Sequence, residues 1–262
     1  MTHRTLKIVT FNIRQPWDYP EDGVNSFIHR AGMILTKIDE EKPDILCFQE
    51  VKPEEKYFLE KYLVDYNVYA HGRNVDLNGE GLATAFRKDT VEMLSADCFW
   101  LSPSPYVPGS RFENQSDCPR ICLATMVRKR EDAHPLWIYN VHLDHKSEAA
   151  RLEQMECLLH HIVSDREKWS LPILLMGDFN SCPGSATMKY CNEFQPFSLR
   201  ELTKDIPFTF HGFGKREPYI KIDYIYADAE TAKGISQVTI WDDCRNGIYL
   251  SDHFPVCMKL DF

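Results

Sequence analysis

One pattern recurs along the chain and limits the folds open to it: an apolar run of strand length ends at a polar residue that can do chemistry. Asn12 follows Ile8–Phe11, and Glu50 follows Ile45–Phe48. Later examples are His142 after Trp137–Val141, Asp178 and Asn180 after Ile173–Met176, and Asp252 and His253 before Pro255–Phe262. In α/β sheets, functional groups commonly gather where strands end. The sequence therefore predicts one site assembled from distant segments.

Two long helices are expected between short strands. Ser26–Glu40, with Ser26 as N-cap, and Ser147–Asp165 have the apolar spacing of helices. Leu101–Pro119 holds many prolines and is predicted to be a long loop. The expected strands are Leu6–Phe11, Ile45–Phe48, Leu82–Phe86, Leu136–His142, Pro172–Met176, Tyr219–Tyr226, Val238–Trp241 and Pro255–Phe262. Strands outnumber helices, which predicts a mixed α/β class with packed sheets and helices outside.

Length and composition indicate one domain over residues 1–262, because no linker or tandem repeat divides the chain. The longest apolar runs, such as Leu171–Met176, are far shorter than the roughly 20 residues that cross a bilayer. The first residues lack the apolar run of a secretory segment, and the nine cysteines show no paired spacing. These features predict a cytoplasmic protein with reduced thiols.

The charge balance narrows the choice of partners. The formal charge is −9, from 30 basic and 39 acidic residues, and no cluster of Lys and Arg stands out. Proteins that hold a long polyanion usually present a basic face. The sequence thus argues against tight non-specific DNA binding, whereas a cleft can still be locally positive.

Two motifs carry the sharpest chemical signals. In Gly177-Asp178-Phe179-Asn180, two oxygen-bearing side chains two residues apart can grip a cation or a phosphate with its attacking water. An Asx turn at a strand end is the alternative. In Ser251-Asp252-His253-Phe254-Pro255, a carboxylate adjoins an imidazole. Neighbouring residues on a strand point to opposite faces, so Asp178 or Asp223 can orient His253 instead of Asp252.

The segment Asn140-Val141-His142-Leu143-Asp144-His145 is ambiguous. It is similar to a zinc motif of metallo-β-lactamase-like hydrolases, but Asn140 stands where that motif needs a His. A binuclear zinc hydrolase using His142, Asp144 and His145 is therefore one alternative. Zinc favours nitrogen and sulfur ligands, whereas most candidate groups in this chain are oxygen donors.

Taken together, six motifs resemble the endonuclease/exonuclease/phosphatase (deoxyribonuclease I-like) family, in the family's order. They are Thr10-Phe11-Asn12-Ile13-Arg14, Phe48-Gln49-Glu50, Asn140–Asp144, Gly177–Asn180, Ile222-Asp223-Tyr224-Ile225 and Ser251–Pro255. The resemblance implies two packed, mostly antiparallel β-sheets flanked by helices, a four-layer sandwich with the active site at one edge. It also implies a phosphoesterase that depends on Mg²⁺ or Mn²⁺.

The resemblance implies roles for nine residues. Glu50 would be the principal metal ligand, with Asn12 beside it, and Asp252 would support the metal or the catalytic His. Asp178 would orient or deprotonate the attacking water. The remaining roles are Asn180 and His142 on the phosphate, His253 oriented by Asp223 as an acid/base pair, and Arg120 as a substrate contact.

The expected substrate is a phosphate ester, small or single-stranded in preference to duplex DNA. The Leu101–Pro119 loop has only Arg111 as a basic residue, unlike the basic loops with which repair endonucleases bend DNA. The aromatic segment Phe208–Phe213 either stacks on a base or packs in the core. No obligate protein partner is evident. A non-catalytic binding protein on the same scaffold is the last alternative, although no motif has lost its acid or His.

Overall fold

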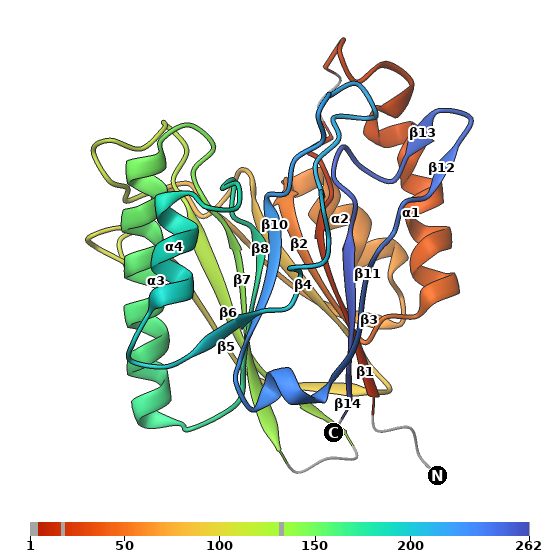
Figure 1. Cartoon of the computed structure of the whole chain (residues 1–262). Coiled ribbons are helices and arrows are strands. Elements are labelled where there is room, and N and C mark those ends of the chain that lie inside the picture. The colour runs from red at the N-terminus through yellow and green to blue at the C-terminus, as the bar shows by residue number, and fades with distance from the viewer. Residues whose placement is uncertain (1–4, 17–18, 131–133, 262) are drawn as a thin grey trace.

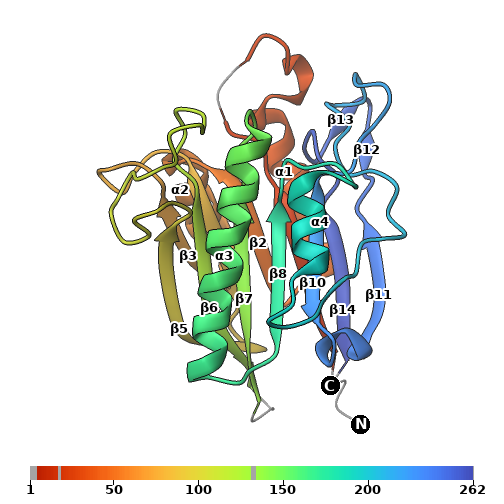
Figure 2. The same cartoon turned by 60° about the vertical axis from the view of Figure 1, so that its left-hand side comes forward.

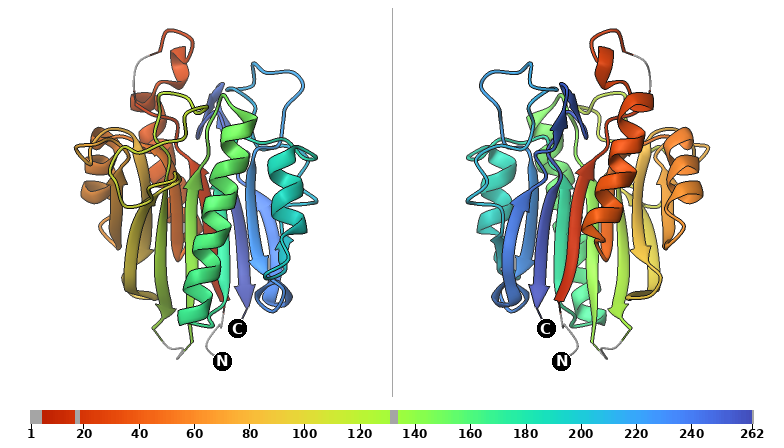
Figure 3. Two further views of the ribbon diagram at one scale, coloured as in Figure 1. Left: turned by 90° about the vertical axis from the view of Figure 1, so that its left-hand side faces the viewer. Right: turned by 90° about the vertical axis from the view of Figure 1, so that its right-hand side faces the viewer.

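The computed structural model describes residues 5–16, 19–130 and 134–261. Two β-sheets pack face to face, and helices cover the outer face of each (Figure 1). The long helix α3 (Glu148–Lys168) and α4 (Ala186–Glu193) lie against one sheet, and α1 (Phe27–Glu41) and α2 (Pro53–Tyr62) against the other (Figures 2 and 3). The four layers confirm the predicted sandwich.

The first sheet has six strands, and only β1 and β2 within it run parallel. Its order is β11 (Ile235–Ile240), β14 (Val256–Asp261), β1 (Thr5–Asn12), β2 (Ile45–Val51), β4 (Gly81–Arg87) and β3 (Tyr66–Gly72). The parallel pair places Asn12 opposite Gln49 at the same end of the sheet.

The second sheet repeats this plan with β7 and β8 as its parallel pair. Its order is β5 (Val91–Trp100), β6 (Ile121–Lys129), β7 (Pro135–His142), β8 (Ile173–Asp178), β10 (Asp223–Asp228) and β9 (Leu199–Glu201). His142 and Asp178 are register partners, and so are Asp178 and Asp223. A small hairpin of β12 (Cys244–Arg245) and β13 (Ile248–Tyr249) stands apart from both sheets.

Alternation along the strands builds three buried apolar layers. In β1, Leu6 and Ile8 face the second sheet, whereas Val9 and Phe11 face the helix layer of α1 and α2. In β8, Leu174 and Met176 lie between the sheets, whereas Ile173 and Leu175 pack under α3. Because strands buried on both faces need no polar face, these runs read as nearly continuous hydrophobic stretches.

Most predicted elements are confirmed within a few residues. Ser26 stands at the N-cap position of α1 as predicted, but its side chain makes no capping hydrogen bond. Ser147, predicted as the first residue of its helix, is the N-cap of α3, and its Oγ accepts the Ala150 N–H at 3.2 Å. The Leu101–Pro119 loop has neither helix nor strand. The last strand, predicted over Pro255–Phe262, runs to Asp261, and Phe262 lies outside the described residues.

The strand predicted over Tyr219–Tyr226 is wrong in its first half, since β10 begins at Asp223. The segment before Asp223 pairs instead with the aromatic segment, where Phe210 and Ile220 exchange backbone hydrogen bonds. Strands β3, β5, β6 and β9 and helices α2 and α4 were not predicted. No helix in the described part of the chain is long and apolar enough to span a membrane.

Candidate active site

At one end of the sandwich, the layer between the sheets changes from apolar to polar. The side chains next to Ile8, Cys47, Ile138, Met176 and Ile225 on the same strand faces are polar or charged. They are Thr10, Asn12, Gln49, Asn140, His142, Asp178 and Asp223, all of which are buried. The site is therefore a continuation of the inter-sheet core, and strand periodicity alone brings its side chains to one place.

A cavity of about 570 Å³ opens at this end. Seven of the nine predicted site residues line it: Glu50, Arg120, His142, Asp178, Asn180, Asp252 and His253. The other two, Asn12 and Asp223, lie behind its wall and hold the lining residues by hydrogen bonds. The structure thus gathers the whole predicted set around one cavity.

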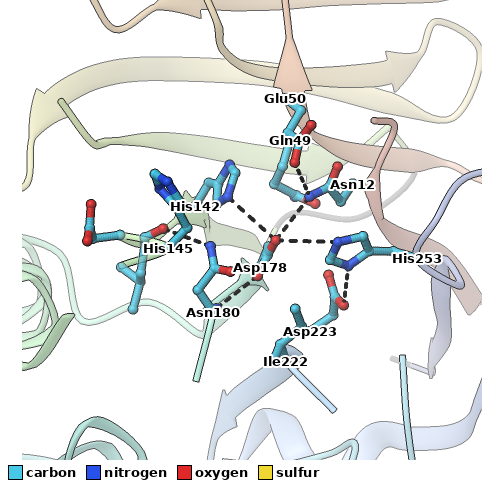
Figure 4. A network of polar contacts seen from close by, with 12 residues as sticks. Asn12, Gln49, Glu50, His142, His145, Asp178, Asn180, Ile222, Asp223 and His253 are labelled. Carbon is cyan, nitrogen blue, oxygen red and sulfur yellow. Dashed lines mark hydrogen bonds and ion pairs between the residues drawn. The ribbon is translucent and has the colours of Figure 1, made fainter. Parts of the chain in front are cut away.

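Asp178 stands at the centre of the site (Figure 4). Its Oδ2 accepts a hydrogen bond from Asn12 Nδ2 at 3.0 Å and lies 3.5 Å from His142 Nε2 and 3.8 Å from His253 Nε2. Burial, and then repulsion from Asp223, raises the pKa of Asp178 to about 7. A carboxylate with this pKa suits proton transfer near neutral pH.

Asp223 and His253 form a buried charged pair. Asp223 Oδ2 lies 2.8 Å from His253 Nδ1, which leaves Nε2 directed toward Asp178. Burial alone would lower the pKa of His253, but the charge and hydrogen bond of Asp223 raise it to about 10. His253 is therefore an imidazolium at neutral pH, and Asp223 fixes its orientation.

Glu50 and Asp252 both line the cavity, and Arg14 attracts both of them. Glu50 accepts hydrogen bonds from Asn12 Nδ2 and the Gln15 N–H, both at 3.1 Å, and Arg14 Nε lies 3.7 Å from Asp252 Oδ2. Burial opposes ionisation of Glu50, but Arg14 and His253 outweigh it and lower the pKa of Glu50. The pKa of Asp252 is raised by burial and by Glu50. Two mutually repelling carboxylates are a place where a cation is stabilising.

Several residues around the site have positive backbone φ angles. Arg14, Glu50 and Asn180 all line the cavity with positive φ angles of 57°, 63° and 49°. Such angles are uncommon for residues other than Gly and cluster at functional sites. Gly177 has φ 145°, and a Cβ there would lie 1.9 Å from the Val141 carbonyl oxygen, so the close pairing of β7 and β8 requires Gly.

His142 lies between Asp178, near its Nε2, and a charged group made of Glu80, Arg73 and Arg120, near its Nδ1. Its Nδ1 lies 4.0 Å from Glu80 Oε1, and Glu80 pairs with Arg73. Burial, followed by the charges of Arg120 and Arg73, lowers the pKa of His142 well below its ordinary value. His142 is therefore neutral and acts as a hydrogen-bonding group, in contrast to His253.

A model of the endonuclease/exonuclease/phosphatase family matches residues 9–253. The chain belongs to this family. An uncharacterised protein of Acanthamoeba polyphaga mimivirus is 26% identical over 266 residues, which cover 96% of this chain and 98% of that protein. An endonuclease/exonuclease/phosphatase from Bacteroides vulgatus is 25% identical with a TM-score of 0.87, covering 98% of this chain and 99% of its own. A mannosyl-6-phosphatase of Bacteroides thetaiotaomicron, 22% identical with a TM-score of 0.84, shares the fold over 98% of this chain and 100% of its own.

The zinc alternative has no support in the geometry of this family member. Asp144 is buried, and its carboxylate accepts hydrogen bonds from Ser116 and from the N–H groups of Lys146 and Ser147. The one convergent group of potential ligands in the described residues is Asp178, Asp223 and His253, not His142, Asp144 and His145. Because Asp223 and His253 bind each other at 2.8 Å, we interpret that group as a charge pair rather than a metal centre.

Five lining or supporting residues have no site role predicted from the sequence. Arg73 and Glu80 enter from the turn between β3 and β4, a polar segment without a strand-end pattern. Gln49 lies beneath the site and donates to Asn140 Oδ1 at 2.8 Å. Arg14 belongs to a quoted motif, yet nothing in the spacing shows its contacts with Asp22 and Asp252. Phe210, in the aromatic segment Phe208–Phe213, lines the cavity 4.8 Å from the His253 ring, between centroids.

Proposed function

We propose that the chain hydrolyses a phosphate ester by in-line attack of a water molecule, with Mg²⁺ or Mn²⁺ as cofactor. The observation that carries this proposal is the position of Asp178 between a neutral His142 and a cationic His253. A base near neutral pH, flanked by one hydrogen-bonding and one charged group, matches what phosphoryl transfer to water requires.

The donor set fits a hard divalent cation. Glu50 is ionised and Asp252 lines the same cavity, so two carboxylates from different segments offer oxygen ligands. Asn12 holds Glu50 in place through Nδ2. Mg²⁺ and Mn²⁺ take oxygen ligands and keep several waters. When bound, such an ion would neutralise charge that develops on the phosphate oxygens.

The protein's own residues supply the remaining steps. Asp178 Oδ2 orients the attacking water and takes its proton. Asn180 and His142 hold the non-bridging phosphate oxygens as hydrogen-bond donors. His253, fixed by Asp223, stabilises negative charge opposite His142 and returns a proton to the leaving oxygen. Arg120, which lines the same cavity as His142, contacts the substrate.

The size of the cavity favours a small or single-stranded substrate over duplex DNA. A volume of about 570 Å³ is typical of small-molecule sites. The mannosyl-6-phosphatase that shares this fold acts on a sugar phosphate, as its name states. A sugar phosphate or another small phosphate ester is therefore the preferred substrate, ahead of nucleic acid.

Two substitutions test the assignment. Asp178→Asn and His253→Ala should each lower turnover by at least about 100-fold while the fold persists, because each removes a proton-transfer or charge-stabilising group. The exposed Asp117 and His160 provide matched controls, Asp117→Asn and His160→Ala. Near-normal turnover in a folded Asp178→Asn or His253→Ala protein refutes the proposed mechanism.

The substrate panel separates the remaining readings. It contains bis-nitrophenyl phosphate, oligonucleotides, sugar phosphates and sphingomyelin, each with Mg²⁺, Mn²⁺ or Zn²⁺ after treatment with EDTA. Recovery of activity with Mg²⁺ or Mn²⁺ supports the proposal, whereas activity with Zn²⁺ alone favours the zinc hydrolase. If no member of the panel is hydrolysed, a non-catalytic binding protein becomes the better explanation.

The location, partners and domain count of the chain stay predictions. A cytoplasmic location, no obligate protein partner and one domain over residues 1–262 are expected from the sequence alone. Limited proteolysis tests the domain count, since a single domain should yield no stable fragment smaller than most of the chain.

A further inference from the structure

One side of the cavity gathers guanidinium groups, although the formal charge of the chain is −9 and four carboxylates, Glu50, Glu80, Asp178 and Asp252, also line the cavity. Three arginines, Arg14, Arg73 and Arg120, line it. Arg14 is balanced by Asp22 and Asp252. Arg73 lies in the β3–β4 turn, and Arg120 is the residue before β6. Among the described residues, Glu80 is the only carboxylate that forms an ion pair with either of them. The excess positive charge thus lies on one side of the cavity.

Arg120 is the strongest sign of a binding site on that side. Its side chain lines the cavity although the residue is only 3% exposed. Its NH2 group donates to His145 Nδ1 at 2.9 Å, whereas Nε and NH1 are buried and have no partner in the described structure. Glu80 and Asp144 lie near enough to attract Arg120, but burying a guanidinium with two nitrogens unpaired is costly, so this arrangement points to an anion as a further partner.

Arg73 is held rigidly beside Arg120. Its guanidinium pairs with Glu80, its N–H donates to the Glu80 carbonyl at 3.1 Å, and its own carbonyl accepts the Trp100 indole N–H at 2.7 Å. Arg73 and Arg120 lie close enough to repel each other. Among the described residues, Glu80 is the only carboxylate in ion-pair contact with either guanidinium, and a fixed guanidinium fork suits a phosphate.

This cationic side is separated from the hydrolytic centre by the His142 ring. Nε2 of His142 faces Asp178 at 3.5 Å, and Nδ1 on the other edge faces Glu80 at 4.0 Å. His145, which holds Arg120, also lines the cavity on the His142 side of Asp178 (Figure 4). An anion held by the two arginines is therefore distinct from the phosphate that Asp178 and His253 surround.

We propose that Arg73, Arg120 and His145 bind a second phosphate group of the substrate, one that is not hydrolysed. His145 accepts from Arg120 through Nδ1, so its Nε2 carries the proton and serves as a third donor. The substrate class is then a small compound with two phosphate groups a few bonds apart. This inference rests on the proposed function for the identity of the hydrolysed phosphate.

Binding to a variant that does not turn over gives the most direct test. The Asp178→Asn protein is titrated calorimetrically with three pairs of probes at 0.15 M salt. The pairs are inorganic phosphate and pyrophosphate, fructose 6-phosphate and fructose 1,6-bisphosphate, and adenosine 5′-monophosphate and adenosine 3′,5′-bisphosphate. In at least one pair, the doubly phosphorylated probe should bind about 10- to 100-fold more tightly, as expected for new charge-assisted hydrogen bonds.

A second variant assigns that advantage to the cationic side. Adding Arg73→Gln together with Glu80→Gln removes one guanidinium without leaving Glu80 buried and unpaired. The advantage of the doubly phosphorylated probe should then fall to threefold or less. The matched control is Arg128→Gln with Glu92→Gln, which removes an ion pair between β6 and β5 that is half exposed. It should keep the full advantage, and circular dichroism checks that each variant folds.

Two results overturn the inference. One is equal binding, within threefold, of both members of every pair. The other is an advantage that survives in the Arg73→Gln/Glu80→Gln variant. The experiments distinguish failure of the second phosphate site from failure of the proposed function. If the native protein hydrolyses monophosphates but shows no advantage for bisphosphates, only the second subsite fails. If the advantage is present but nothing is hydrolysed, only the proposed function fails.

Discussion

Thr209 links the two halves of the Asp223–His253 pair. Its hydroxyl oxygen accepts the backbone N–H groups of Ile222 at 3.1 Å and Asp223 at 3.0 Å. Its carbonyl accepts the Phe254 N–H at 2.7 Å, next to His253. Thr209 is fully buried and does not touch the cavity. It is therefore a positioning residue, whose effect on catalysis passes through the geometry of the pair.

Thr209→Val keeps the shape of the side chain and removes the acceptor. Two buried N–H groups then lack a partner, and each such loss costs about 1–3 kcal/mol. The expected loss of unfolding free energy is about 2–6 kcal/mol. If the Ile222–Asp223 backbone shifts to find other partners, the 2.8 Å contact between Asp223 and His253 lengthens and turnover falls by at least about tenfold.

Urea denaturation followed by circular dichroism measures the stability, and steady-state kinetics measures kcat and KM separately. The matched control is Thr36→Val on the outer face of α1, where the hydroxyl donates only to the Gly32 carbonyl of its own helix. It should change stability by less than about 0.5 kcal/mol. A loss below 1 kcal/mol for Thr209→Val, or a normal kcat in a destabilised protein, would show that Thr209 does not position the pair.

Two further substitutions test the fold beneath the site. Burial raises the pKa of Glu55 to about 9 from an ordinary 4.5, so the folded protein keeps a proton that the unfolded chain loses. Stability should therefore fall as pH rises from about 5 to 9, by up to about 1.4 kcal/mol per unit, and Glu55→Gln should flatten that slope in urea denaturation. Gly177→Ala should cost about 3 kcal/mol or more in thermal denaturation, because its Cβ meets the Val141 carbonyl. Gly184→Ala, with φ 82° but open space, isolates the smaller cost of the backbone angle; equal losses in the two would contradict the steric argument.

The site was predictable where strand periodicity places it. His142, Asp178 and Asn12 follow apolar runs, and the parallel pairs β1–β2 and β7–β8 bring such strand ends to one edge. Arg73 and Glu80 were not predictable in this way. They reach the cavity through the β3–β4 turn, and the position of that turn depends on tertiary pairing rather than on a local pattern.

Several strands that are apolar on both faces were predictable, such as β1, β2, β7 and β8, although β6 was not predicted despite being buried over Ile121–Thr125. β5 was missed because it is an edge strand whose register shifts between Met93 and Ser95, and its middle residues are exposed. The start of helix α2 is nevertheless marked in the sequence by Pro53 at its first position and by Glu55, whose side chain accepts the Lys52 N–H. Tyr219–Tyr226 alternates like a strand, but the Thr209 hydroxyl accepts the N–H groups of Ile222 and Asp223 at the point where β10 begins.

The relative position of the two sheets decides whether Glu50 and Asp178 can act on one substrate, because each comes from a different sheet. Apolar contacts between sheets are non-directional and do not fix that register. Directly beneath the site, Asn140 of the second sheet donates to the Phe48 and Ala83 carbonyls of the first at 3.2 and 3.1 Å, and accepts from Gln49 at 2.8 Å. These bonds are directional and fully buried, so sliding one sheet over the other leaves several polar groups unpaired at once. The hydrogen bonds of Asn140 and Gln49 therefore fix the position of one sheet relative to the other, directly beneath the residues whose geometry catalysis depends on.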